Sequence, residues 1–229
     1  KYNYSGPRYT SYPTALEFHE AYTPAEFDMA CTQYPERPLS LYIHIPFCHK
    51  LCYFCGCNKV ITRHHHKADI YLDSLELEIR QRAALFTERT VTQLHFGGGT
   101  PTFLTKIQFT RLMTLLRGEF NFEEGAEISI EVDPREIELD MLDHLRDEGF
   151  NRLSIGVQDF NKEVQQLVNR DQDEDFIISM VQRAKDLGFR STNLDLIYGL
   201  PKQSAESLAL TIKRVLEMEP GRLSVFNYA

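Results

Sequence analysis

The 229-residue sequence has no tryptophan, only five cysteines and no long hydrophobic run. No apolar stretch approaches the roughly 18 residues that a membrane span needs, and the N-terminal segment lacks the apolar core of a secretory signal. Basic residues are also in the minority, because 25 Lys and Arg stand against 33 Asp and Glu and give a net charge of −8. This charge disfavours general attraction to nucleic acid or anionic lipid. We therefore expect a cytoplasmic protein that binds neither nucleic acid nor membrane.

The residues that are present can build a substantial core. Hydrophobic residues make up 42% of the chain and aromatic residues 11%, which is enough for one large domain or two small ones. The chain begins without Met and stops inside an apolar run at residues 225–229. We interpret it as a piece of a longer protein.

From residue 39 onward, short β-rich runs alternate with longer runs of helical period. The predicted strands are 39–45, 91–96, 127–132, 152–157, 192–198 and 222–227. Apolar residues recur at helical spacing over 68–83, 109–116, 139–145, 177–184 and 208–216. Six such strands alternating with helices predict right-handed βαβ units and a parallel sheet. Residues 1–38, rich in Tyr, Pro and Thr, are predicted to form an irregular arm with one helix at 24–32, and residues 39–229 a single domain.

One alternate face of these strands is polar, although a parallel strand buried on both faces is usually apolar throughout. Tyr42 and His44 show this pattern in the first strand, Glu131 in the third and Asp195 in the fifth. We infer that the apolar set faces the helices and that the polar set lines a ligand-holding interior. This favours an α/β fold of the partial (β/α)6 barrel type over an open doubly wound sheet. The working residues should then gather at the C-terminal ends of the strands.

Four of the five cysteines lie within ten residues, in the segment YIHIPFCHKLCYFCGCNK at 42–59. In a cytoplasmic protein such crowding indicates a metal site rather than disulfides. Cys48, Cys52 and Cys55 have the spacing C-x3-C-x2-C, and three thiolates can hold three irons of a cubane cluster while the fourth iron stays open to a ligand. Structural zinc is the alternative, with His44, His49 or the histidines at 64–66 as nitrogen ligands. Zinc, however, usually takes four ligands from two separate knuckles.

This cysteine spacing after the first strand resembles the signature of the radical S-adenosylmethionine (SAM) enzymes. Further motifs are similar to those of the oxygen-independent coproporphyrinogen III oxidases. They are YNYSGPRYTSYPTA at 2–15, YIHIPFC at 42–48, CGC at 55–57, HFGGGTPT at 95–102, EISIEVDPRE at 127–136, RLSIGVQDFN at 152–161 and NLDLIYGLP at 193–201. The resemblance covers essentially the whole chain. It implies a partial (β/α)6 barrel of the radical SAM type, followed in the family by a largely helical C-terminal domain that this chain lacks.

The resemblance implies a [4Fe-4S] cluster held by Cys48, Cys52 and Cys55, together with two SAM molecules. The positions implied to bind the first SAM are Tyr42, Gly98 and Glu131, and those implied for the second are Phe54, Gly99, Thr100, Gln158, Arg170, Asp195 and Ala229. The chemistry of these residues is compatible with such roles. Glycine lets the backbone approach a ligand closely, the two carboxylates can accept hydrogen bonds, and an arginine can meet a carboxylate as a planar fork.

The implied reaction is the oxygen-independent oxidative decarboxylation of two propionates of coproporphyrinogen III to vinyl groups, giving protoporphyrinogen IX in porphyrin and haem biosynthesis. In this family an electron from the cluster cleaves SAM, and the resulting 5′-deoxyadenosyl radical takes a hydrogen atom from the propionate β-carbon. The partners would be this substrate and an unidentified reducing electron donor, and we expect a monomer. Arg8 on the arm is a candidate contact for the substrate's carboxylates.

Cys57 is interpreted as a catalytic residue rather than a ligand, because four protein thiolates would leave no iron open for SAM. In the resemblance, this fourth cysteine marks the decarboxylating oxidases, whereas related haem-binding or haem-handling radical SAM proteins usually carry an aromatic residue there. Such a haem-handling protein is the first alternative reading. A binding module braced by zinc is the second.

Overall fold

The computed structural model describes residues 17–228. Its main sheet contains six parallel strands that are neighbours in chain order. They are β1 (Leu39–Ile45), β4 (Thr90–Gly98), β5 (Asn121–Val132), β6 (Arg152–Gln158), β7 (Ser191–Tyr198) and β8 (Arg222–Asn227). The chain-order arrangement and the parallel pairing confirm the βαβ units that the sequence predicts.

The predicted helices are also confirmed, and shorter elements join them. The α-helices are α1 (Pro24–Thr32), α2 (His66–Ala83), α3 (Lys106–Glu119), α4 (Leu139–Asp147), α5 (Lys162–Leu167), α6 (Glu174–Asp186) and α7 (Ala205–Glu217). A 3₁₀ helix, η2 (Pro101–Phe103), and a two-stranded sheet of β2 (Phe47–Cys48) and β3 (Val60–Ile61) complete the set. The sequence prediction misses α5, η2, β2 and β3, because elements of two to six residues are too short to show a period.

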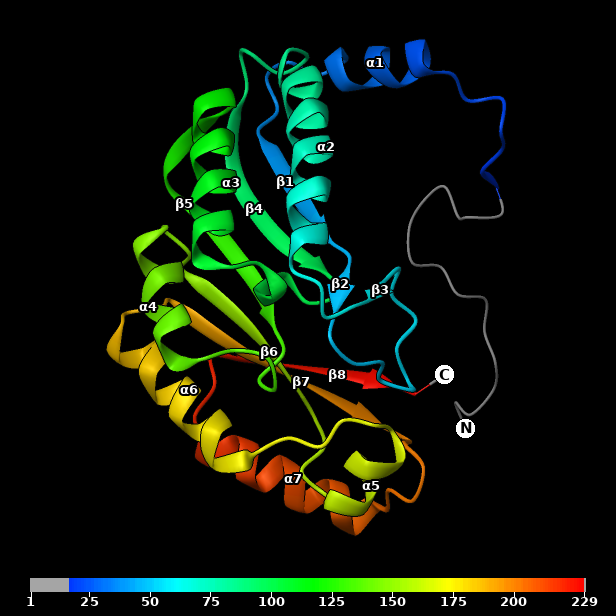
Figure 1. The fold of residues 1–229 in the computed structure, drawn as a ribbon, viewed down its shortest axis with the longest axis vertical. Coiled ribbons are helices and arrows are strands. Elements are labelled where there is room, and N and C mark those ends of the chain that lie inside the picture. The colour runs from blue at the N-terminus through cyan, green and yellow to red at the C-terminus, as the bar shows by residue number, and fades with distance from the viewer. Residues whose placement is uncertain (1–16, 229) are drawn as a thin grey trace.

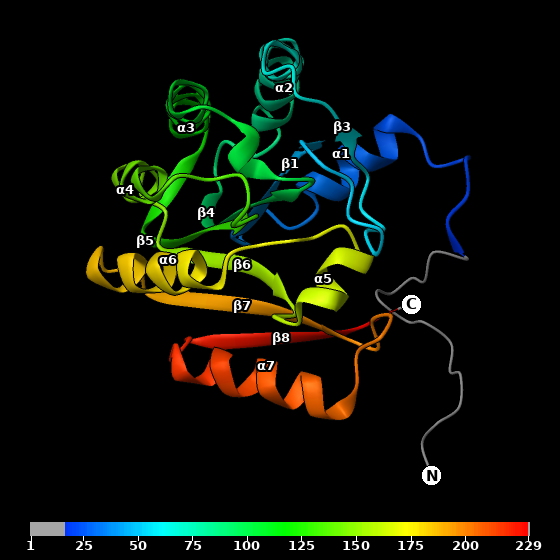
Figure 2. The same cartoon turned by 60° about the horizontal axis from the view of Figure 1, so that its bottom comes forward.

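The sheet curves, and helices α2, α3, α4, α6 and α7 lie along its outer face (Figures 1 and 2). Strands β1 and β8 stand at the two ends of the strand order, and no pairing joins them within residues 17–228. The barrel is therefore open, as the sequence predicts. Its inner face is left for the cysteine-bearing loop between β1 and α2, which Figure 2 shows on the side away from the outer helices.

The alternation of the strand residues decides which face is buried. Leu94, Phe96, Ile130, Ile155 and Leu194 are completely buried and point toward the helices. The polar alternates on the opposite face bind one another instead. Across β6, β7 and β8, Asn193 donates to the Ser154 hydroxyl at 2.8 Å, Ser154 donates to Asp195 at 2.9 Å, and Ser224 donates to Asn193 at 3.0 Å. The inner face thus carries a polar network, which confirms the inference from the sequence pattern.

Glycines end two of the outer helices, as their sequence position predicts. Gly149 follows α4 with φ 89° and Gly188 follows α6 with φ 73°, a backbone conformation that residues with a Cβ rarely adopt. In each case the next phenylalanine donates its backbone N–H back into the helix, Phe150 to Leu145 O and Phe189 to Ala184 O, both at 3.0 Å. These turns deliver the chain directly into β6 and β7.

The described part of the arm, residues 17–38, is anchored through α1 and the residues that follow it. Thr23 caps α1 in a reciprocal capping box with Glu26, and Arg82 of α2 pairs with Asp28 at 3.4 Å. Arg89 donates to the Arg37 carbonyl at 2.6 Å. In the part of the chain from 17 to 228, no helix has the length and apolar character that crossing a membrane requires.

We predict that Phe150→Ala lowers the free energy of unfolding by about 3–5 kcal/mol, as expected for truncating a fully buried phenylalanine. The Phe150 ring is completely buried and packs against Phe96 and Phe109, with ring centroids 5.2 and 6.0 Å away. Urea unfolding measures the loss. Ile107→Ala is the control, since Ile107 is 83% exposed on α3 and its loss should cost less than about 0.5 kcal/mol. Equal losses in the two variants would contradict this packing.

Candidate functional site

A cavity opens where the C-terminal ends of the strands meet the cysteine loop. The residues expected to bind ligands that line it are Cys48, Cys52, Phe54, Cys55, Cys57, Gly98, Gly99, Thr100, Glu131, Gln158, Arg170 and Asp195. Residues that sequence reasoning missed also line it, namely Lys50, Lys59, Asp133, Arg135, Ser154 and Gly156. Nearly all of the candidate site residues therefore lie together, because parallel strands end at the same edge of the sheet.

One expected residue, Tyr42, is not part of the cavity lining, and two others are not described by the structure. Tyr42 is beside the cavity but does not line it; its hydroxyl lies 3.0 Å from His44 Nδ1 and its ring stacks on His95 with centroids 5.8 Å apart. Ala229 and Arg8 lie outside the described residues. Among the described residues that the resemblance implies as SAM contacts, Tyr42 is thus the one that does not line the cavity.

The cysteine loop is fastened to its surroundings by backbone hydrogen bonds. Val60 N donates to Pro46 O at 2.7 Å and Thr62 N to Cys48 O at 2.9 Å, which closes the loop on itself through β2 and β3. Tyr53 N donates to Val168 O at 3.0 Å, so the loop also reaches the end of α5. These contacts hold the four cysteines in place through the main chain, independently of the thiols.

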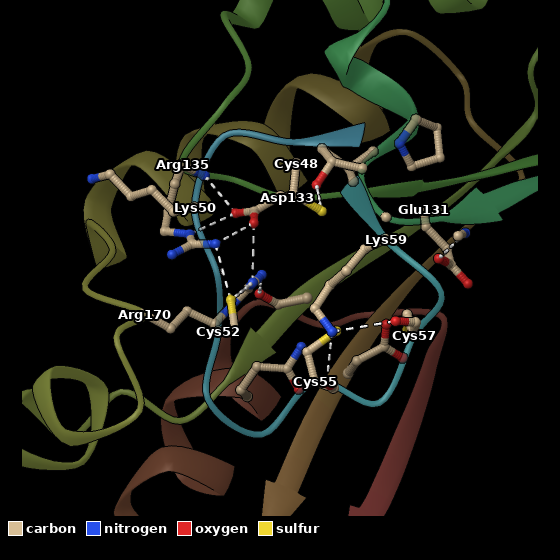
Figure 3. Close-up of a pocket in the computed structure, with 18 of the residues that line it drawn as sticks. Cys48, Lys50, Cys52, Cys55, Cys57, Lys59, Glu131, Asp133, Arg135 and Arg170 are labelled. Atoms are coloured by element: carbon tan, nitrogen blue, oxygen red, sulfur yellow. Dashed lines mark hydrogen bonds and ion pairs between the residues drawn. The ribbon is translucent and has the colours of Figure 1, made fainter. Parts of the chain in front are cut away.

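The two buried cysteine sulfurs, of Cys48 and Cys52, have different partners (Figure 3). Cys48 Sγ accepts a hydrogen bond from the Thr100 hydroxyl at 3.4 Å, and burial, only partly offset by that bond, raises the pKa of the Cys48 thiol to about 11. Cys52 Sγ instead accepts from two guanidinium groups, Arg135 Nη2 at 3.1 Å and Arg170 Nη1 at 3.4 Å. The Cys52 sulfur thus has two cationic hydrogen-bond donors, whereas the Cys48 sulfur has a neutral one.

Cys55 and Cys57 act on each other. A hydrogen bond from Cys57, opposed by burial and aided by the Lys59 charge, lowers the pKa of Cys55 to about 5, and the same bond raises the pKa of Cys57. Within this pair the pKa is thus lowered at Cys55 and raised at Cys57. Lys59 Nζ fixes the loop at this point by donating to Cys55 O at 2.9 Å and Cys57 O at 3.2 Å, as Figure 3 shows.

The glycine loop after β4 lies against the start of the cysteine loop. Gly99 N donates to Ile45 O at 2.9 Å, and Thr100 N donates to Phe47 O at 2.8 Å. A Cβ on Gly99 would lie 2.6 Å from Pro46 O and 2.8 Å from Phe47 O, and backbone atoms cannot move aside as a side chain can. Gly98 has φ 119°, where only glycine is comfortable. The glycines thus permit the close approach of two backbones as well as of a ligand.

The two expected carboxylates sit on adjacent rows of the inner face. Glu131 accepts from Gly98 N at 3.3 Å and lies 3.4 Å from His95 Nε2, while about half of its side chain remains exposed to the cavity. Asp195 is more enclosed, and burial, opposed by hydrogen bonds from Ser154 and Asn193, raises its pKa. Both carboxylates therefore reach the cavity from the inner face of the barrel.

Arg170 and Asp133 form a buried pair that the sequence did not suggest. Arg170 Nη1 lies 3.0 Å from Asp133 Oδ2 and its Nη2 donates to Gly156 O at 2.6 Å, so its terminal nitrogens already bind protein atoms. Its Nε is buried and finds no hydrogen-bond partner among residues 17–228. Burial disfavours the charge of Asp133, but Arg170 and Arg135 outweigh it and hold the pKa of Asp133 at about 2. The motif EVDPRE at 131–136 carried this signal, since its acid and base lie just past the end of β5.

The donor set fits an iron-sulfur cluster better than a single ion. No group of three or more His, Cys, Asp or Glu side chains within residues 17–228 converges to hold one metal ion, as a zinc site requires. Cys48, Cys52 and Cys55 instead line one cavity from different sides, which suits thiolates held apart by a cubane. Arginines beside Cys52 and a lysine beside Cys55 offset the negative charge that such a cluster carries.

Residues 42–215 match the radical SAM superfamily, and the chain therefore belongs to that superfamily. The cofactors that define it are a [4Fe-4S] cluster and SAM, as the cysteine spacing and the glycine loop predict.

More specific similarities follow from individual relatives. The chain is 73% identical over all 229 residues to an oxygen-independent coproporphyrinogen III oxidase of Salmonella typhimurium, covering 50% of its length, and 71% identical to that of Escherichia coli over the same share. The chain spans about half the length of these curated relatives.

Solved structures agree with this grouping. The chain resembles the structure of coproporphyrinogen III oxidase (HemN) from Escherichia coli, described as a radical SAM enzyme, with a TM-score of 0.94 and 70% identity over 96% of this chain and 51% of that one. It resembles methylornithine synthase (PylB) with a TM-score of 0.56 at 17% identity, over 90% of this chain and 58% of that one. The second similarity shows the shared fold only.

We predict that Gly99→Ala destabilises the protein by about 1–3 kcal/mol, because the added Cβ overpacks against the backbone of Pro46 and Phe47. Thermal and urea unfolding measure the effect. Gly118→Ala is the matched control: it lies inside α3 with open space around it, and replacing a helical glycine with alanine should be neutral or stabilising by up to about 1 kcal/mol. If Gly99→Ala is as stable as Gly118→Ala, the two loops do not pack as described.

Proposed function

We propose that the protein of which this chain is part carries out the oxygen-independent oxidative decarboxylation of two propionates of coproporphyrinogen III, giving protoporphyrinogen IX. The observation that carries the proposal is the single cavity in which Cys48, Cys52 and Cys55 meet the glycine loop at 97–99 and the Glu131 and Asp195 carboxylates. The high identity to coproporphyrinogen III oxidases over the whole chain supports this substrate over haem handling. Residues 39–229 are the radical SAM unit in this proposal.

We assign the cluster to Cys48, Cys52 and Cys55, and two SAM molecules to the rest of the cavity. Gly98 and Glu131, with Tyr42 beside them, would hold the first SAM, since Glu131 has an exposed carboxylate that can accept from an ammonium. The second would lie among Phe54, Gly99, Thr100, Gln158, Arg170, Asp195 and Ala229. When bound, the cluster and SAM would supply a one-electron reduction that generates the radical needed to remove a hydrogen atom.

The chain's own residues orient the ligands and exclude water. Phe54 packs against the buried cluster formed by Val164, Val168, Ile197 and Leu200, so its ring closes one side of the cavity with apolar surface. Gln158 has φ 66°, an uncommon conformation for a residue with a side chain, and lines the same cavity. Strain of this kind is typical of ligand sites.

The substrate carries four carboxylates and needs local cations in an acidic protein. Lys50 and Lys59 line the cavity and supply such charge, and Arg8 of the arm is a further proposed contact. We also propose that the protein acts as a cytoplasmic monomer that receives electrons from a separate reducing donor.

Anaerobic reconstitution of the full-length protein tests the function. We expect a brown protein that cleaves SAM, and that releases carbon dioxide and forms protoporphyrinogen IX when coproporphyrinogen III is added. A protein that binds stoichiometric zinc and stays colourless would refute the proposal. SAM cleavage accompanied by haem binding, without decarboxylation, would favour the haem-handling alternative.

We predict that replacing Cys48, Cys52 or Cys55 by Ser removes the cluster, because two thiolates remain for four irons. Iron and sulfide analysis and the visible spectrum of each reconstituted variant measure this. Cys31→Ser is the control, because Cys31 lies at the end of α1, far along the chain from the loop, and should keep full iron content. Full iron and full SAM cleavage in any of the three ligand variants would rule out that ligand.

We predict a different result for Cys57→Ser, which should keep its iron and cluster spectrum but lose most decarboxylation. Cys57 lines the cavity and is exposed to it, two residues beyond Cys55. A side chain in this position can reach a bound SAM or substrate without being a ligand. The comparison is iron content against product formed per enzyme. Loss of iron would instead make Cys57 a ligand and contradict its catalytic role.

A further inference from the structure

Three charged side chains are buried together behind the cysteine loop: Asp133, Arg135 and Arg170. Their side chains are only 9%, 7% and 8% exposed. Arg135 grips the Asp133 carboxylate as a fork, through Nη2 at 2.6 Å and Nε at 3.0 Å, and Arg170 Nη1 binds the same carboxylate at 3.0 Å. Two cations thus share one anion, and one positive charge is left without a carboxylate.

The third partner of this cluster is the Cys52 sulfur. Arg135 Nη2 lies 3.1 Å from it and Arg170 Nη1 lies 3.4 Å from it, as the dashed lines in Figure 3 show. Two buried cations that share the Asp133 carboxylate leave positive charge beside this sulfur. A cluster ligated by Cys52 would bring negative charge to the same position.

The other two expected ligands have no guanidinium partner. Cys48 Sγ accepts from the neutral Thr100 hydroxyl, and the cation near Cys55 is Lys59, whose Nζ donates to the carbonyls of residues 55 and 57. Among the described residues, guanidinium hydrogen bonds to cysteine sulfur are found at Cys52 alone. The three cysteines therefore differ in the donors that surround them.

The two arginines differ in what else they do. Arg170 also donates to Gly156 O, and a Cβ on Gly156 would lie 2.7 Å from its Nη2, so Arg170 is part of the packing of β6. Arg135 makes one other contact, from Nη1 to Asn169 O at 3.1 Å, and lies at the cavity edge. Arg135 can therefore be changed with less disturbance of the barrel.

We propose that Arg135, oriented by Asp133, is a positioning residue that supplies the counter-charge and an N–H···S hydrogen bond to Cys52 and so raises the reduction potential of the cluster. The inference rests on the proposed function, because it needs a cluster on Cys52. Reduction adds negative charge, which a neighbouring cation and hydrogen bonds to a ligand sulfur stabilise. The Asp133 fork holds the guanidinium plane in place, so the donor is oriented before any cluster binds.

Redox titration of the reconstituted full-length protein tests this, using wild type, Arg135→Gln and Arg135→Lys. At a fixed solution potential we expect the Gln variant to show an at least tenfold lower ratio of reduced to oxidised cluster, equivalent to about 59 mV for one electron. The Lys variant keeps the positive charge but not the two-pronged guanidinium, and its ratio of reduced to oxidised cluster should fall by less than about threefold. Iron content and the melting curve of the apo protein are measured alongside.

Arg152→Gln is the matched control. Arg152 pairs with Glu127 across β5 and β6, at the opposite end of these strands from the cavity, and should leave the ratio unchanged. If the Gln variant folds but loads no iron, full iron loading of the Lys variant supports the same assignment. The assignment is wrong if neither variant loads iron, or if both show the same shift in the ratio of reduced to oxidised cluster. It is also wrong if the ratio in the Gln variant stays within twofold of wild type.

The test separates this inference from the proposed function. A wild-type protein that binds no cluster defeats the proposed function. A wild-type protein with a cluster, alongside an Arg135→Gln variant of unchanged potential, defeats only the role of Arg135.

Discussion

The parallel direction of all six strands is the constraint on which the rest of the structure depends. Every strand ends at the same edge, so the segments that follow β1, β4, β5, β6 and β7 are brought together although they are far apart in the chain. The cysteine loop follows β1, the glycine loop ends β4, and Asp133 follows β5. In register, Glu131 lies beside Ser154, and Gly156 lies beside Asp195. The sheet thus assembles a site that no single segment contains.

The loops at this edge are held by one another before any ligand is considered. The cysteine loop is bonded to the glycine loop through Gly99 and Thr100, and to the end of α5 through Tyr53. Main-chain hydrogen bonds carry this arrangement, so the cysteine side chains are free for binding. A site whose supporting contacts are independent of its ligands is preorganised, which lowers the ordering cost of binding.

The charge around the cysteines is opposite in sign to the net charge of the chain. The chain is acidic overall, but the residues around the cysteine sulfurs include Arg135, Arg170 and Lys59. One carboxylate, Asp133, holds two of these cations in place and leaves the remaining positive charge to face a sulfur. The polar inner face and the buried group of Asp133, Arg135 and Arg170 thus form the site, whereas the apolar outer face packs against the helices and stabilises the fold.

The sequence by itself determined the six strands, the main helices and the open barrel, and it singled out the three cysteines proposed as ligands, because a period of two or 3.6 residues and a C-x3-C-x2-C spacing are local patterns. It also placed Glu131 and Asp195 on the inner face, since alternation fixes which way a strand residue points. The buried group of Asp133, Arg135 and Arg170 around Cys52 was decided by tertiary structure. Its members are up to 118 residues apart and come from three different loops, and only the register of neighbouring strands brings them within hydrogen-bond distance. The sequence also could not show that Arg170 pairs with Asp133 or that Gly99 packs against the backbone of Pro46. Both contacts depend on how separate loops pack together, and the spacing of residues along the chain does not reveal such packing.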